Sequence, residues 1–294
     1  MIKSVLLVTG GAGFIGSHLI ELLVKKYPKI KIISVDNYFT GKKENHINHK
    51  NVKYLKGNTM DIFNVWKKRK LPKPKAIFHL GEYSRVVQSF NDFDLVWNFN
   101  IEGTKEVIKF ASKVGAKLVY AGSSSKFGDR EYENLSPYSW IKAKNIELIK
   151  NYSNWFDLNY VITYFYNVYG PKHIRQGKYS TVVGIFEKQF ENEKPLTVVS
   201  PGTQTRDFTH VKDIVEGMLI CYQKGSGDGY QLGTGRELSI IGLAKMFKTK
   251  YILIPEKTGE RERGKADFSK AKKLGWNPKI EIEDYINEFI NHSN

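Results

Sequence analysis

The chain has 294 residues, of which 46 are lysine or arginine and 30 are aspartate or glutamate, giving a formal net charge of +16. Hydrophobic residues make up 41% and charged residues 26%, proportions that exclude a disordered or fibrous chain. The single cysteine, Cys221, excludes an intramolecular disulfide framework and a cysteine-based metal cluster. No apolar run approaches the roughly 18 residues of a membrane span, so we expect a cytoplasmic protein without a membrane segment.

The positive charge is mostly lysine and is spread along the chain, with one dense run at residues 67–70. This run has no interleaved aromatic residues for stacking on bases, so it predicts a solvated loop rather than a nucleic-acid site. Small anionic molecules such as nucleotide phosphates are the favoured partners, and nucleic acid remains an alternative.

The first half of the chain alternates short apolar runs with longer helical patterns. Strands are expected at 4–8, 30–35, 52–55, 76–80, 117–121 and 160–165, and helices at 14–27, 97–113 and 138–152. This alternation predicts an α/β fold, a Rossmann-type doubly wound parallel sheet with helices on both faces.

After Gly170-Pro171 the alternation becomes irregular, with helices expected at 181–190, 211–222 and 282–290. We therefore expect a nucleotide-binding domain at 1–168, with a return segment near 205–235. Residues 169–294 are expected to form mainly a smaller α/β substrate-binding domain.

A glycine-rich turn follows the first predicted strand and opens the first predicted helix. Gly10, Gly13 and Gly16 are spaced so that the backbone can turn tightly, approach a pyrophosphate and pack against the strand. Asp36 lies 20 positions beyond Gly16, where a carboxylate can accept hydrogen bonds from an adenosine ribose. The pattern predicts a dinucleotide site that favours NAD; Lys42 and Lys43 leave NADP open.

A second group of residues carries chemistry. Tyr138 and Lys142 are four positions apart and share one face of a predicted helix. A tyrosine hydroxyl has a pKa near 10, and a neighbouring ammonium group favours the phenolate that acts as a base. Ser123 ends a predicted strand at the sheet edge where such folds hold their chemistry. Together the three residues predict a centre for hydride transfer between an alcohol and a ketone.

Several motifs in order give the chain a resemblance to a known family. They are Thr9 to Gly16, Val35-Asp36-Asn37, His79-Leu80, Asn100 with Gly103-Thr104, Ser123 to Gly128, Tyr138 with Lys142, Asn167 to Pro171, Thr205 to Phe208, Gly233-Thr234-Gly235 and Ala266-Asp267 to Trp276. The sequence resembles the extended short-chain dehydrogenases/reductases, in particular the NAD-dependent nucleotide-sugar epimerases and dehydratases. The resemblance implies NAD as cofactor, a nucleotide-sugar substrate, and a homodimer formed through residues 97–113 and 138–152, with Ile146 and Ile149 as candidate interface residues.

The resemblance also implies further site residues. Besides the glycines, Asp36, Tyr138 and Lys142, those expected at the cofactor are Phe14, Ile15, Asn37, Asn58, Thr59, Leu80, Gly81, Asn100 and Tyr166. Those expected at the substrate are Glu82, Ser124, Ser125, Asn167, Arg206, Arg263 and Gly264, the last as a gate for the size of the sugar. The seven histidines show no metal-ligand spacing, so no metal is expected.

The residues after Ser123 separate the reactions known in the family. Relatives that eliminate water carry an acidic pair at the positions of Ser124 and Ser125, and those that decarboxylate carry glutamate at the position of Ser125. With no acid here, the resemblance implies epimerisation at C4 of a UDP-hexose or UDP-N-acetylhexosamine. A nucleotide-sugar 4-ketoreductase or dehydrogenase remains open, as does a non-catalytic nucleic-acid-binding relative.

Overall fold

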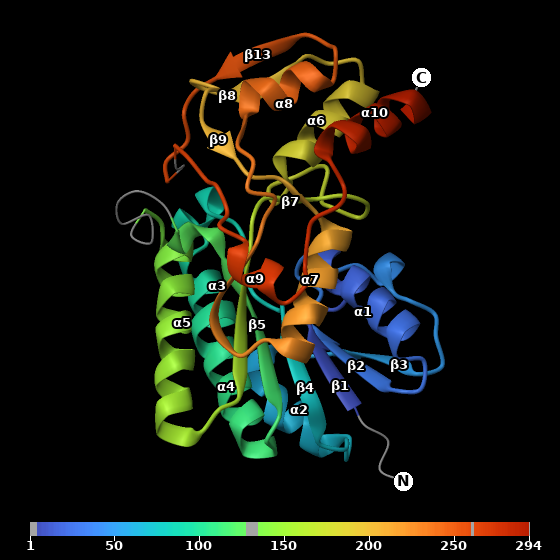
Figure 1. Cartoon of the computed structure of the whole chain (residues 1–294), viewed down its shortest axis with the longest axis vertical. Helices are drawn as coiled ribbons and strands as arrows, with labels where there is room; N and C mark the ends of the chain where they lie inside the picture. The colour runs from blue at the N-terminus through green and yellow to red at the C-terminus, as the bar shows by residue number, and fades with distance from the viewer. Residues whose placement is uncertain (1–4, 128–134, 260–261, 294) are drawn as a thin grey trace.

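The computed structural model describes residues 5–127, 135–259 and 262–293 and contains a seven-stranded, wholly parallel sheet (Figure 1). The strand order is β11-β6-β5-β4-β1-β2-β3. The strands are β1 (Val5–Thr9), β2 (Lys31–Asp36), β3 (Val52–Lys56), β4 (Pro74–His79), β5 (Lys117–Ser123), β6 (Tyr160–Phe165) and β11 (Gly227–Leu232). The order reverses at β1, so the chain forms the predicted doubly wound α/β fold. Two residues named in the sequence patterns, Ser4 and Gly128, lie outside the described residues.

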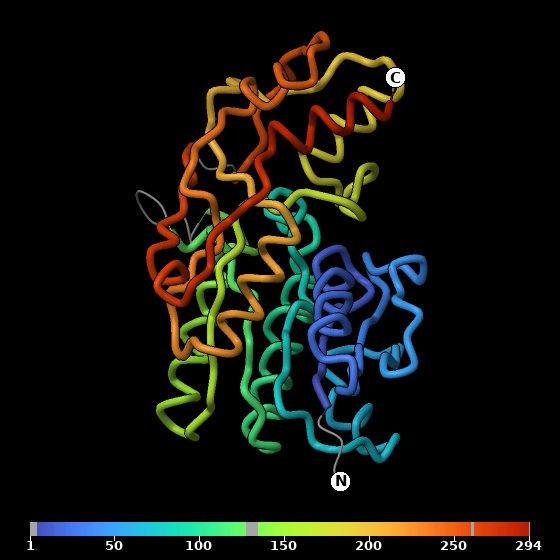
Figure 2. The backbone as a smooth tube through the Cα atoms, turned by 45° about the vertical axis from the view of Figure 1, so that its right-hand side comes forward, coloured from blue at the N-terminus to red at the C-terminus, as the bar shows by residue number. Residues whose placement is uncertain are grey.

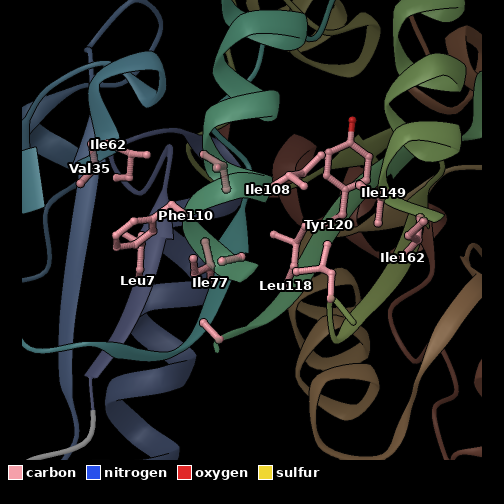
Figure 3. Close-up of a cluster of buried hydrophobic side chains, with 14 of the residues drawn as sticks. Leu7, Val35, Ile62, Ile77, Ile108, Phe110, Leu118, Tyr120, Ile149 and Ile162 are labelled. Atoms are coloured by element: carbon pink, nitrogen blue, oxygen red, sulfur yellow. The ribbon is translucent and has the colours of Figure 1, made fainter. Parts of the chain in front are cut away.

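Helices cover both faces of this sheet. One face packs against α2 (Ile62–Lys68), α4 (Gly103–Val114) and α5 (Pro137–Phe156). The opposite face packs against α1 (Phe14–Lys26), α7 (Val211–Lys224) and α9 (Ser269–Lys273). Figure 3 shows part of the first core, where Ile77, Leu118 and Ile162 from the strands meet Ile108 and Ile149 from the helices. Burial on both faces explains why the inner strands β1, β4, β5 and β6 are apolar runs in the sequence.

Helix α5 positions the predicted base. The Ser136 side chain accepts a hydrogen bond from the backbone N–H of Ser139, and Pro137 occupies the first helical position. The helix therefore begins just before Tyr138. Ile146 and Ile149 are 1% and 0% exposed within the chain's own core, so they cannot form the surface of a dimer as the sequence suggested.

The helix expected at 97–113 begins earlier and is irregular. It consists of α3 (Phe93–Val96), a π-helical turn at Trp97–Glu102 and then α4. The Asn100 carbonyl lies within the π-helical turn and accepts a hydrogen bond of 2.8 Å from Asn145 on α5. Such turns are rare and often lie near functional sites.

A smaller unit lies above the sheet in Figure 1, with its own apolar core. It contains α6 (Val182–Glu191), α8 (Ile240–Met246), α10 (Ile282–Ser293) and the paired strands β8 (Leu196–Val199) and β13 (Tyr251–Ile254). Short two-stranded pairs form between β7 (Val168–Tyr169) and β10 (Thr209–His210), and between β9 (Thr205–Arg206) and β12 (Leu238–Ser239). Short 3-10 turns lie at Lys43–Asn45, Thr59–Asp61, Val87–Phe90 and Ser124–Lys126.

The chain crosses between the two units more than once. Residues 211–232 return to the sheet as α7 and β11, and α9 packs on the same face, as the orange and red tube in the lower part of Figure 2 shows. Trp276, buried beside α7, donates from its indole nitrogen to Asp213 O at 2.9 Å. No helix in the described part of the chain is both long and apolar enough to cross a membrane.

Candidate active site

A cleft of about 560 Å³ opens at the carboxyl ends of the sheet strands and reaches the smaller unit. This is the edge at which doubly wound folds bind their ligands. It is lined by most of the residues that the sequence singled out: Gly10, Gly13, Phe14, Ile15, Gly16, Asp36, Asn37, Thr59, Leu80, Gly81, Glu82, Ser123, Ser124, Ser125, Tyr138, Lys142, Asn167 and Arg206. The fold thus brings together residues from distant parts of the sequence.

Five expected site residues do not line the cleft. Asn58 precedes the turn at Thr59, and Asn100 is buried with its side-chain amide bonded to the backbone of Tyr83. Tyr166 is buried and donates its hydroxyl to Gln231. Arg263 is exposed and Gly264 is buried outside the lining. Phe165, the neighbour of Tyr166, lines the cleft instead.

The glycine turn has the shape that a dinucleotide requires. A Cβ atom on Gly16 would lie 2.1 Å from Gly10 O, and one on Gly10, whose φ is +71°, would lie 2.9 Å from the Gly81 backbone. A Cβ atom on Gly13 would meet only Gly10 O, at 3.2 Å, so the space in front of Gly13 is open. Gly13 also caps α1, whose first N–H groups and positive dipole end suit a pyrophosphate. The residues present therefore fit NAD.

Asp36 ends β2 beside this turn. Its Oδ2 accepts the backbone N–H of Ala12 at 2.9 Å and its Oδ1 that of Tyr38 at 2.7 Å. Burial raises the pKa of Asp36, and these two hydrogen bonds oppose that rise. A carboxylate held here can accept hydrogen bonds from the adenosine ribose and repels a 2′-phosphate.

Ser123 ends β5 at the base of the cleft. Its Oγ accepts hydrogen bonds from the Ser125 hydroxyl at 2.9 Å and the Ser125 N–H at 3.3 Å. Because those contacts use the lone pairs of Ser123, its own hydroxyl hydrogen is available to donate to a ligand oxygen.

Tyr138 and Lys142 project from the first turns of α5 into the same cleft. The Lys142 ammonium donates to Tyr120 OH at 2.9 Å, to Ala121 O at 2.5 Å and to the carboxylate of Glu82. These three contacts use all three of its hydrogens. Burial raises the pKa of Tyr120 well above its usual value, so its hydroxyl stays protonated.

Glu82 lies under the cleft rather than across it. The sequence grouped it with the substrate contacts, but its side chain is 5% exposed and turned into the interior. Oε2 pairs with Lys142, and Oε1 accepts from Thr104, Tyr120 and Asn145 at 2.7, 3.0 and 3.0 Å. Although burial opposes ionisation, Lys142 holds the pKa of Glu82 below its ordinary value. The carboxylate is therefore charged and committed to Lys142.

A chain of hydrogen bonds connects Glu82 to the glycine turn. Thr104 donates to Glu82, so its oxygen accepts from His79 Nε2 at 2.9 Å. His79 Nδ1 then accepts from Thr9 Oγ1 at 2.7 Å. Burial lowers the pKa of His79 to about 4, which agrees with this neutral form. This count of hydrogens assigns the tautomer of His79. The network connects the Glu82–Lys142 ion pair to Thr9, at the start of the glycine turn.

Asp207 connects its own motif to three others at the far side of the cleft, those that contain Asn167, Thr234-Gly235 and Ala266. Its carboxylate accepts the N–H groups of Thr234, Gly235 and Ala266 at 2.8, 2.8 and 3.2 Å. The Asn167 side chain donates to Asp207 O at 3.1 Å. Asp207 is fully buried, so these contacts set the position of the neighbouring Arg206 at the cleft wall.

Sequence reasoning missed Arg85, which also lines the cleft. Nothing in its local pattern marked it, because its position depends on a contact 94 residues away, from Nε to Tyr179 O at 2.7 Å. No group of three metal-ligating side chains occurs among the described residues.

The comparisons with known proteins agree with this geometry. Residues 6–233 match the model of the NAD dependent epimerase/dehydratase family. A Methanocaldococcus jannaschii protein provisionally named UDP-glucose 4-epimerase is 29% identical over 97% of each chain. UDP-glucuronic acid decarboxylase 6 of Arabidopsis thaliana is 30% identical over 95% of this chain and 85% of its own. The crystal structure of UDP-glucose 4-epimerase from Thermotoga maritima with UDP-glucose superposes with a TM-score of 0.90, at 26% identity over 98% of both chains. The chain belongs to the NAD-dependent epimerase/dehydratase family, and its cofactor is NAD.

Proposed function

We propose that the protein catalyses epimerisation at C4 of a nucleotide-diphosphate sugar, a UDP-hexose or UDP-N-acetylhexosamine, through a transient 4-keto sugar. The observation that carries this proposal is the serine run beside Tyr138. Ser124 and Ser125 are hydroxyls where elimination of water or loss of CO2 needs a carboxylic acid. The carboxylate of Glu82 is 5% exposed and paired with Lys142.

Each residue has a distinct task in this reaction. The Tyr138 phenolate takes the proton from the sugar 4-hydroxyl, and returns it when C4 is reduced. The Ser123 hydroxyl donates to the same oxygen, since its lone pairs are already engaged by Ser125. Lys142 lines the same cleft one turn further along α5, with its ammonium held by Glu82, Tyr120 and Ala121. NAD, which the glycine turn and Asp36 would hold, would supply the acceptor and donor of the hydride exchanged at C4.

The nucleotide end of the substrate belongs at the opposite side of the cleft. Asn167 and Arg206 lie there, tied to the buried Asp207, and an arginine suits a diphosphate. The sugar would then extend toward Tyr138.

One specific observation favours a second candidate, decarboxylation of a nucleotide uronic acid. The relative of 30% identity is named for that reaction. Against it stands Ser125, which donates its hydroxyl to Ser123 and has no acidic group to offer. Ketoreduction would use the same three residues but needs a separate supply of reduced cofactor.

The test is to incubate the NAD-loaded protein with UDP-glucose and with UDP-N-acetylglucosamine and to separate the products by chromatography. The 4-epimer should form without net change in NAD. Tyr138→Phe should lose at least about 100-fold of the rate, the usual worth of a general base, while keeping its NAD. Tyr152→Phe, on the same helix but outside the cleft, is the matched control. A Tyr138→Phe variant with more than a tenth of wild-type activity, a 4-keto-6-deoxy product, or a pentose formed from added UDP-glucuronate would contradict the proposal.

A further inference from the structure

Arg85 presents a guanidinium to the cleft. Its Nε donates to Tyr179 O at 2.7 Å and its Nη1 to Ser84 O at 2.8 Å. These backbone contacts hold the planar group against the wall. They leave Nη2 without a hydrogen bond to any residue in the described part of the chain.

Arg85 also lacks a counter-charge, because no carboxylate among residues 5–127, 135–259 and 262–293 forms an ion pair with it. By contrast, Arg175 contacts both Glu187 and Glu191, at 3.0 and 2.6 Å. Burial lowers the pKa of Arg85 because removing a cation from water without a partner costs free energy. A guanidinium nevertheless remains charged at neutral pH. Within the described ranges, Arg85 is therefore a cation without a carboxylate partner at the wall of the cleft.

This cation lies at the reacting end of the cleft. Arg85 Nε donates to the backbone of Tyr179, and the Tyr179 side chain lies in one apolar cluster with Tyr138 and with Val86, the neighbour of Arg85. The other cation at this end, Lys142, already has Glu82 as its partner. Of these two cations, Arg85 is therefore the one without a carboxylate partner in the described part of the chain.

We propose that Arg85 binds a carboxylate carried by the sugar, so that among UDP-hexoses the protein prefers the nucleotide-linked hexuronic acid. The inference rests on the proposed C4 chemistry, because Tyr138 marks where C4 must lie. The carboxylate of a hexuronic acid is attached to C5, the ring carbon next to C4. A guanidinium beside Tyr138 can reach it, and the two N–H groups of Nη2, which no described residue engages, can donate charge-assisted hydrogen bonds to it.

The experiment measures the binding of UDP-glucuronate and UDP-glucose to the NAD-loaded protein by calorimetry. The two ligands share the nucleotide and the diphosphate and differ in the group on C5. The wild type should bind UDP-glucuronate more tightly. In Arg85→Met the ratio of the two dissociation constants should fall about 10- to 100-fold, the worth of a charge-assisted hydrogen bond. Arg85→Lys, which keeps the charge but loses the backbone contacts that orient the guanidinium, should lie between.

Arg69→Met is the matched control, since Arg69 is exposed, lies outside the cleft and carries the same charge; its ratio should equal that of the wild type. Thermal unfolding with NAD checks that each variant is folded. A wild type that binds UDP-glucuronate no better than UDP-glucose, or not at all, overturns the proposal. So does an Arg85→Met variant that weakens both ligands by one factor, which would assign Arg85 to the diphosphate. If the ratio of the two dissociation constants changes as expected but no 4-epimer forms from either sugar, the carboxylate site is supported and the proposed epimerase activity is wrong.

Discussion

The pair of Glu82 and Lys142 makes a quantitative prediction about stability. Both side chains are 5% exposed, and Glu82 accepts hydrogen bonds from four donors. Glu82→Gln keeps the shape of the side chain but removes its charge. The ammonium of Lys142 is then left buried without its partner, a change that typically costs about 3 to 5 kcal/mol. The free energy of unfolding should fall by that amount at pH 7.5.

The pH dependence supplies an internal check. Because the pKa of Glu82 is held below its ordinary value of 4.5, its contribution to stability is present above pH 4.5. It is lost as the pH falls through the pKa of the folded state. A protonated glutamic acid resembles glutamine, so the gap between wild type and Glu82→Gln should close in acid.

The assay is urea unfolding of both proteins at pH 7.5 and at stepwise lower pH, with NAD at one saturating concentration because bound cofactor itself stabilises the fold. Glu147→Gln is the matched control, since Glu147 forms an ion pair with Lys144 at 2.8 Å on the exposed face of α5. Its unfolding midpoint should stay close to that of the wild type. A gap for Glu82→Gln below about 1 kcal/mol, or one independent of pH, would refute the reasoning.

Three further predictions concern the cofactor site and assembly. Gly13→Ala should leave the unfolding of the cofactor-free protein nearly unchanged, because its Cβ meets only Gly10 O, at 3.2 Å. The dissociation constant for NAD, measured by fluorescence titration, should rise at least about tenfold. An unchanged NAD affinity would contradict the assigned position of the pyrophosphate. Asp36→Asn should shift preference toward NADP, because the carboxylate that repels a 2′-phosphate is gone; competitive titration of both nucleotides measures this, and an unchanged ratio would refute it. We propose a homodimer through the exposed aromatic side chains of Phe93, Trp97 and Trp140, which are 46%, 37% and 38% exposed on α3, the π-helical turn and α5. Light scattering should give a dimer for the wild type and 33.8 kDa for Trp97→Asp, and a monomeric wild type would reject the interface.

The strands of the fold were readable from the sequence to different degrees. Five strands, β1, β2, β4, β5 and β6, are largely buried and show as apolar runs, whereas the edge strand β3, with the sequence VKYLK, alternates buried and exposed positions. The seventh, β11, has the sequence GDGYQL, with two glycines at positive φ, and carries no such run. Its place in the sheet comes from parallel pairing with β6, a contact between segments some 65 residues apart, which local patterns do not encode.

The site was readable where a motif fixes the backbone. The glycine turn and the Tyr138–Lys142 spacing carry their geometry with them. Successive side chains point to opposite faces at the end of β6. The sequence predicted Tyr166 at the cofactor, but Phe165 lines the cleft and Tyr166 is buried in the core, an error of one position. The direction of Glu82 could not be read either, because its four partners come from α4, β5 and α5.

The central claim is that hydride leaves and returns to the same carbon, and an isotope label tests it most directly. UDP-glucose carrying deuterium at C4 is converted by the NAD-loaded protein, and the products are examined by NMR and mass spectrometry. The account predicts that both 4-epimers retain the deuterium at C4. Deuterium found at C6 in a 4-keto-6-deoxy sugar, or lost to added NAD without formation of the epimer, would contradict it.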